Sequence, residues 1–156
     1  MTEWIEKKYK TEYDDCDVQG LRLKFYDGIT AYEREEIVKF CKWIRENYFF
    51  PIRVNVCFVA QKKFKSPDDG HLYSGIFYSP DEIEFLQYPR IFVATEFKDA
   101  KERYEVLFTL AHELTHYYQW NFMEDEKKSD RSLEIMANRW STYILKEYGG
   151  KMAGEG

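Results

Sequence analysis

The stretch Thr109-Leu110-Ala111-His112-Glu113-Leu114-Thr115-His116-Tyr117-Tyr118 places two histidines four residues apart, with a glutamate directly after the first. This is the H-E-x-x-H arrangement of zinc-dependent hydrolases. On a helix, residues four apart lie on one face, so His112 and His116 can bind the same tetrahedral metal ion. Glu113 projects about 100° away from them, which suits a residue that acts on water rather than on metal. The stretch therefore predicts a helix that carries two metal ligands and a general base.

The residues around the motif predict how this helix packs. From about residue 99 to residue 121, apolar side chains recur at helical spacing. Four of them fall on the side opposite the histidines: Leu107, Leu110, Leu114 and Tyr117. We therefore expect the histidines to face a cleft, while the other side of the helix packs against the core.

A second helix should follow the motif. The charge run at 124–130 predicts a solvated loop, and helical spacing resumes from residue 130 or 132 to Tyr148. Gly149-Gly150 would end this helix, because glycine is the common residue just beyond a helix C-terminus. Residues 151–156 are expected to form a mobile tail.

The amino-terminal part predicts one helix and a small sheet. Thr30, with Glu33 three residues later, forms a capping box, and the helix that begins there should end before Pro51. Residues 52–59 alternate and are rich in β-branched side chains, which is typical of a strand. Further strands are expected at 21–25, 72–78, 82–86 and 90–94.

These elements predict an α+β fold. A small mixed or antiparallel β-sheet of four to five strands would pack against the active-site helix, the N-terminal helix and the C-terminal helix that carries Glu134. The chain of 156 residues has the size of one domain. We therefore expect a single zincin-like domain over 1–156, in which residues 1–28 are peripheral.

Charge and cysteine content limit the partners and the compartment. A net charge of −5 gives no general attraction to nucleic acid or to an anionic bilayer. No stretch is long and apolar enough to span a membrane, and the segment 1–8 is charged where a secretory signal would be apolar. The sequence therefore predicts a cytoplasmic protein that binds neither nucleic acid nor membranes. Three cysteines lack the C-x-x-C spacing and are expected as buried thiols: Cys16, Cys41 and Cys57.

A catalytic zinc ion needs a third protein ligand, because such ions commonly have three and keep one position open. The metzincin pattern would require a histidine where this chain has Phe122, and His71 lies far upstream in a turn. A group of acids lies in the charged loop: Glu124, Asp125, Glu126 and Asp130. Glu134 begins an ordered helix and is the favoured ligand. Asn138, four residues later on the same face, could accept the free ring N–H of a ligand histidine.

Two segments carry a resemblance to a known family. His112-Glu113-Leu114-Thr115-His116, followed by Glu134-Ile135-Met136-Ala137-Asn138, resembles the gluzincin metallopeptidases and looks most like the ImmA/IrrE-like peptidases. In that family an AHELxH helix precedes an ExxAN or ExxAD helix, and Ala111 and Ala137 match its small positions. The resemblance covers roughly residues 90–146. The chain departs from the family at Thr115, which is usually glycine, and at Asn138, which is often aspartate.

The resemblance implies one Zn²⁺ ion bound by His112, His116 and Glu134. It further implies that Glu113 is the general base and that Asn138 orients a ligand histidine. The activity expected from it is hydrolysis of a peptide bond in a peptide or protein substrate, such as a regulator in a mobile-element or stress-response system. Whether a regulatory partner protein also binds is left open by the sequence.

Sequence alone gives only a broad choice of residues that could contact the substrate. Five side chains are candidates for stabilising an oxyanion or for touching the substrate: His71, Tyr117, Tyr118, Arg139 and Tyr143. A substrate strand is expected to pair with the sheet edge near Ile91–Ala94.

Two other function classes remain open. The first is a zincin-fold binding or sensor module with a structural zinc and no hydrolytic activity, which a fourth protein ligand or a blocked cleft would favour. The second is a zinc hydrolase of a non-peptide amide. That enzyme would have a narrow, deep pocket instead of an open groove beside an edge strand.

Overall fold

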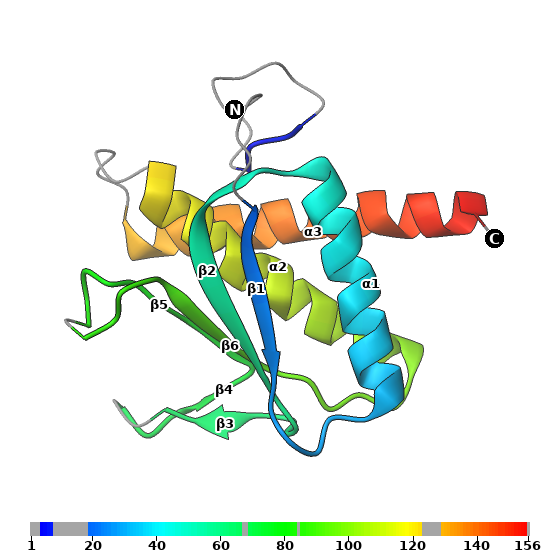
Figure 1. Cartoon of the computed structure of the whole chain (residues 1–156), viewed down its shortest axis with the longest axis horizontal. Helices are drawn as coiled ribbons and strands as arrows, with labels where there is room; N and C mark the ends of the chain where they lie inside the picture. The colour runs from blue at the N-terminus through cyan, green and yellow to red at the C-terminus, as the bar shows by residue number, and fades with distance from the viewer. Residues whose placement is uncertain (1–3, 8–18, 67–68, 84, 123–128, 156) are drawn as a thin grey trace.

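The computed structural model describes residues 4–7, 19–66, 69–83, 85–122 and 129–155. Three helices and a four-stranded mixed sheet form an α+β fold, as the sequence predicts (Figure 1). A small two-stranded antiparallel sheet lies beside them. The acids Glu124, Asp125 and Glu126, together with Cys16, lie outside the described residues.

The four-stranded sheet has the order β1-β2-β6-β5. Its strands are β1 (Gln19–Phe25), β2 (Phe50–Val59), β6 (Arg90–Ala94) and β5 (Gly75–Tyr78). β2 is parallel to both β1 and β6, whereas β5 is antiparallel to β6. The alternation predicted for β2 holds around Arg53, which is exposed next to the buried Val54, but not at Cys57, which is buried like its neighbours in a strand that has another strand on each side.

The strand predicted at 72–78 is divided into two. Its first part, β4 (Leu72–Tyr73), pairs with β3 (Phe64–Lys65) in the small sheet, and its second part is β5. At the division, the Ser74 carbonyl accepts a hydrogen bond from the Ala94 amide at 2.8 Å. Ser74 is therefore the single residue that separates β4 of the small sheet from β5 of the four-stranded sheet.

The strand predicted at 82–86 is wrong for the described residues of that segment. The amides of Glu82 and Ile83 both donate to the Ser79 carbonyl, at 3.2 Å each, and this closes a turn. Alternation of apolar residues does not make this segment a strand, because these backbone N–H groups are already bonded within the turn and cannot pair with a neighbouring strand.

The first helix, α1 (Ala31–Asn47), begins as the capping box predicts. The Glu33 amide donates to Thr30 Oγ1 at 3.1 Å, and the Thr30 amide donates to Glu33 Oε1 at 2.9 Å. The second carboxylate oxygen of Glu33 accepts from the Phe97 amide at 3.1 Å. The cap therefore also fixes α1 against the segment that leads into the motif helix.

The last two helices are α2 (Ala100–Phe122) and α3 (Asp130–Glu155). The prediction that the last helix ends at Gly149-Gly150 is wrong, because α3 continues through both glycines. Positive φ, which a glycine C-cap adopts, occurs among the described residues only at Gly28 and Gly70. A helical glycine costs about 1 kcal/mol relative to alanine, which lowers stability without stopping a helix.

Trp4 and β1 correct the expectation that residues 1–28 are peripheral. The Trp4 side chain is 0% exposed, and its ring stacks on Tyr118 of α2 with centroids 5.2 Å apart. Its Nε1–H donates to Thr115 Oγ1 at 3.0 Å, and Leu21 of β1 is likewise fully buried. A tryptophan supplies a large apolar surface and needs one hydrogen-bond acceptor when buried, and α2 provides both.

Two further expectations can be compared with the described residues. Cys41 and Cys57 are buried free thiols, as predicted. None of the helices in the described ranges is both long enough and apolar enough to cross a membrane.

Removal of the Trp4–Thr115 hydrogen bond should destabilise the fold. Trp4→Phe should lower the free energy of unfolding by about 1–2 kcal/mol, because it removes one buried donor and some ring volume. In a double-mutant cycle with Thr115→Val, urea unfolding should give a coupling energy of about 1 kcal/mol. Trp140→Phe is the control, since the Nε1–H of Trp140 has no partner among the described residues. Additive effects at positions 4 and 115 would contradict the prediction.

Candidate metal centre

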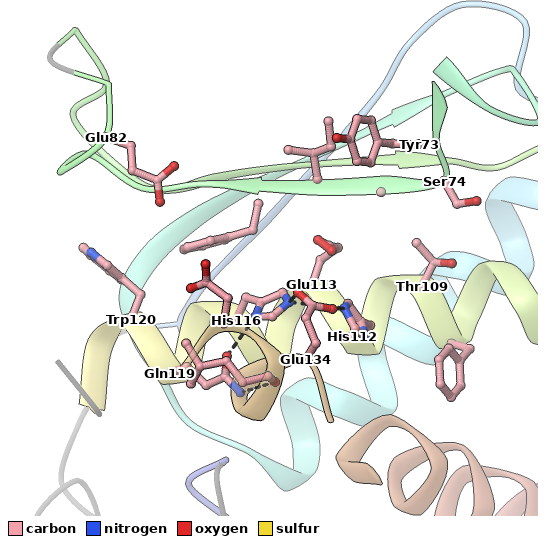
Figure 2. A pocket seen from close by; sticks show the side chains of 16 residues that line it. Tyr73, Ser74, Glu82, Thr109, His112, Glu113, His116, Gln119, Trp120 and Glu134 are labelled. Atoms are coloured by element: carbon pink, nitrogen blue, oxygen red, sulfur yellow. Dashed lines mark hydrogen bonds and ion pairs between the residues drawn. The ribbon is translucent and has the colours of Figure 1, made fainter. Parts of the chain in front are cut away.

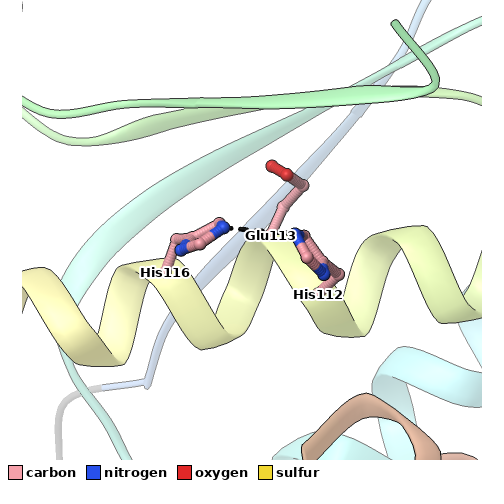
Figure 3. A group of neighbouring side chains, drawn as sticks. All are labelled: His112, Glu113 and His116. Carbon is pink, nitrogen blue, oxygen red and sulfur yellow. Dashed lines mark hydrogen bonds between the residues drawn. The ribbon is translucent and has the colours of Figure 1, made fainter. Parts of the chain in front are cut away.

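The two motif histidines project from one face of α2. Their rings are nearly perpendicular, with centroids 4.8 Å apart, and the two Nε2 atoms are separated by 3.2 Å (Figure 3). The opposite side of α2 is buried, as the sequence predicts, and includes Leu107, Leu110, Leu114 and Tyr117. The fixed packing of that side determines the direction in which His112 and His116 point.

Glu134 of α3 reaches both histidines. Its Oε2 lies 2.9 Å from His112 Nε2, and its Oε1 lies 2.9 Å from His116 Nε2 (Figure 2). The Glu134 side chain is 56% exposed, so it closes the cluster from the solvent side. Two helices thus bring together the three groups that the sequence nominated as metal ligands.

Each histidine also has a hydrogen-bond partner outside this cluster. His116 Nδ1 lies 2.8 Å from Gln119 Oε1, and the Gln119 amide nitrogen donates to the Leu133 carbonyl at 3.0 Å. Because an amide oxygen only accepts, Nδ1 of His116 carries the proton and its Nε2 keeps a lone pair. Asn138 makes a side-chain hydrogen bond with His112 that favours the protonated ring, as an acceptor does. The expected role of Asn138 is therefore consistent with its position.

Gln119 is a residue of the cluster that the sequence analysis does not name. It lies three residues after His116 on α2, and side chains at this spacing are neighbours on a helix surface. A search for amides or carboxylates near each motif histidine would have found it.

The spacing of the three groups fits a single tetrahedral zinc ion. With metal–nitrogen bonds of about 2.0–2.1 Å, tetrahedral ligand atoms lie roughly 3.3 Å apart. The observed separations are 3.2 Å between the two histidines and 2.9 Å from each histidine to Glu134. Burial, and then the nearby His116, lower the pKa of His112, and a neutral imidazole is the form that binds metal.

Glu113 is the other carboxylate near the histidines. It forms with them a group whose ligand atoms lie within 4.8 Å of one another. Glu134 fits a ligand role better than Glu113, because each of its oxygens lies 2.9 Å from a ring nitrogen of a different histidine. Figure 3 shows Glu113 directed away from the two rings, toward β5.

The Glu113 carboxyl is buried, with 6% of the residue exposed. Its Oε2 has no hydrogen-bond partner among the described residues. Burial, and then the negative charge of Glu134, raise the pKa of Glu113 to about 8. A carboxyl in this environment can hold or release a proton near neutral pH.

The cluster opens into a cleft of about 840 Å³ between α2 and β5 (Figure 2). Gly75 of β5 permits this arrangement. A Cβ atom at residue 75 would lie 2.6 Å from Thr109 Cγ2 and 3.0 Å from Glu113 Cγ. Glycine therefore lets the edge strand pass directly over the buried carboxyl.

Two of the candidates for substrate contact are wrong. The Tyr117 hydroxyl donates to the Ile52 carbonyl at 2.6 Å, and the Tyr118 hydroxyl donates to the Phe49 carbonyl. Both side chains are fully buried, because their positions in α2 face the core and not the cleft.

The other candidates also lie away from the cleft. Its lining does not include His71, Arg139 or Tyr143. Tyr73 and Ser74 do line it, although the Tyr73 hydroxyl already donates to Asp69.

The sheet edge beside the cleft also differs from the prediction. β6, which contains Ile91–Ala94, lies between β2 and β5 and has neighbours on both sides. The edge next to the site is β5, which pairs with β6 in the antiparallel direction. The pattern within each strand does not indicate this order of strands in the sheet.

Glu113 should make the metal-free protein less stable as the pH rises. With a folded pKa of about 8 against an ordinary value of 4.5, folding takes up a proton between these values. The stabilising effect is complete below pH 4.5 and is lost as the pH rises through 8. With a chelator present, wild-type should lose roughly 3 kcal/mol more than Glu113→Gln between pH 5 and pH 7.5. Parallel pH profiles in urea unfolding would contradict the raised pKa.

Comparisons with known proteins found no similar protein: no protein-family model, no curated protein and no solved structure matches this chain. The interpretation of its function therefore depends on the residues of the cluster and on the cleft into which they open.

Proposed function

We propose that this protein is a zinc metallopeptidase that hydrolyses a peptide bond in a peptide or protein substrate. The observation that carries the proposal is the convergence of His112, His116 and Glu134 from two helices. Their facing atoms are 2.9–3.2 Å apart. This is also the ligand set that the resemblance to the ImmA/IrrE-like peptidases implies.

The roles of the residues follow from their positions. When bound, zinc supplies Lewis acidity, which polarises a carbonyl and makes water more acidic. Glu113 accepts a proton from the attacking water and passes it to the leaving amine nitrogen as the carbon–nitrogen bond breaks. Gln119 and Asn138 hold the ligand rings in the orientation that directs both Nε2 atoms to one point.

The edge strand β5 supports a peptide as the substrate. An extended peptide could pair with the free backbone edge of Gly75–Tyr78 and run along the cleft above α2. Because Gly75 lies directly over Glu113, such a peptide would pass beside the proposed base. A groove beside an edge strand favours a peptide over a small amide that would need an enclosed pocket.

Metal binding should depend on each member of the cluster. We expect zinc to bind the wild-type protein stoichiometrically, and His116→Ala or Glu134→Ala to weaken it by about 100-fold or more, because each removes a ligand. Gln119→Ala and Asn138→Ala should each weaken it by about 10–100-fold. Titration against a competing chelator measures these affinities. Glu147→Gln, an exposed change on the same helix as Glu134, is the control.

Hydrolysis should depend on Glu113 separately from metal binding. Glu113→Gln should keep stoichiometric zinc, measured by elemental analysis, but lose at least about 100-fold in the rate of peptide cleavage. New termini in a library of proteome-derived peptides, detected by mass spectrometry, give the rate. Full activity in this variant would overturn the assigned base. A zinc-loaded wild-type protein that cleaves nothing would favour the structural-zinc alternative.

A further inference from the structure

We propose that the end of the cleft beside Trp120 is a subsite for a lysine or arginine side chain, so that the substrates are basic peptides. This inference rests on the proposed function and names its substrate class. Trp120 lies four residues after His116, which is one helical turn of about 6 Å along the same face of α2. The subsite would therefore hold a side chain close to the bond that is cleaved.

The charged groups of the cleft are almost all acidic. Its lining contains four carboxylates, those of Glu82, Glu113, Asp130 and Glu134. No lysine or arginine is found among the described residues that line it. Glu134 belongs to the histidine cluster, whereas Glu82 and Asp130 have no cationic residue beside them among the described residues of the lining. A cationic group is the ligand that these two carboxylates would attract.

Trp120 has a fixed orientation at this end of the cleft. Its Nε1–H donates to Asp81 Oδ2 at 2.7 Å, and its ring packs against Phe77 of β5 with centroids 6.4 Å apart. The same hydrogen bond holds the 79–83 turn, and Figure 2 shows the Glu82 carboxylate above the cleft at the end where Trp120 lies. The aliphatic stem of a lysine or arginine could lie along these rings, with its charged head near Glu82.

A buried carboxyl group that lines the same cleft also lacks a hydrogen-bond donor. Glu113 is 6% exposed, its Oε2 has no hydrogen-bond partner among the described residues, and it lines the same cleft. An anionic peptide would bring more negative charge beside this group and beside Glu82 and Asp130. A neutral peptide would leave the outer two carboxylates without a counter-ion. The charges that line the cleft thus favour a basic peptide over a neutral or an acidic one, whatever the shape of its side chain.

The test measures binding without turnover. Zinc-loaded Glu113→Gln protein is titrated with acetylated, amidated heptapeptides of alanine whose central residue is lysine, arginine, glutamine or glutamate. We expect the lysine and arginine peptides to bind at least tenfold more tightly than the glutamine peptide, since two carboxylates and a cation–π contact favour them. In ¹⁵N-labelled protein they should also shift the Trp120 indole N–H resonance.

Variants separate the subsite from the general charge of the protein. Adding Glu82→Gln and Asp130→Asn together should reduce the preference to less than about threefold. Glu105→Gln together with Glu147→Gln removes the same two charges from exposed positions on α2 and α3 outside the cleft and should leave the preference unchanged. These exposed substitutions should not disturb folding, and circular dichroism checks this. Equal binding of the lysine and glutamine peptides, or a preference that survives the double change, would overturn the subsite.

Failure of the subsite and failure of the enzyme can be told apart. Cleavage by the wild-type protein at sites without a nearby lysine or arginine would overturn the subsite and leave the peptidase standing. A binding preference for basic peptides, with no cleavage by the wild-type protein, would overturn the peptidase and leave a basic-peptide binding site.

Discussion

The contact of one carboxylate with two imidazoles is the interaction on which the site depends. Glu134 belongs to α3, whereas His112 and His116 belong to α2, so the cluster exists only while the two helices keep their relative position. Gln119 reinforces that position, because its side-chain oxygen contacts His116 while its side-chain nitrogen donates to the Leu133 carbonyl of α3. The packing of α3 on α2 and the proposed metal site are therefore one constraint. A shift of α3 by one turn would remove Glu134 from the cluster and leave the two histidines facing each other.

The parts that sequence predicted best are those decided within one helix or by one cap. The i,i+4 histidines, the Thr30–Glu33 capping box and the buried side of α2 are local patterns, and all are present. Glu134 is likewise named by the sequence, because an acid on an ordered helix is a better candidate than one in a charged loop, and it does lie 2.9 Å from both histidines. By contrast, the position of β5 outside β6 depends on contacts between distant strands, which the pattern within each strand does not encode.

The errors have specific physical causes. Tyr117 and Tyr118 follow the motif and are predicted near the cleft, but a helix turns the residues next to His116 away from its face, and both are buried. The amino-terminal segment shows no periodicity, which predicts a peripheral position, yet the Trp4 side chain is fully buried against α2. Its acceptor is Thr115, at the position where the resembling family usually has glycine. That departure therefore has a structural explanation: the hydroxyl satisfies the indole that packs beneath the motif helix.

Gly75 gives the cleft a property that follows from the lack of one methyl group. Its Cα passes so close to α2 that any side chain would press on Thr109 and on the stem of Glu113. The distance between β5 and α2 and the position of the Glu113 carboxyl are therefore linked. A side chain at residue 75 that pushed β5 away from α2 would also displace the Glu113 side chain. Residue 75 therefore sets both the width of the cleft and the position of the Glu113 carboxyl.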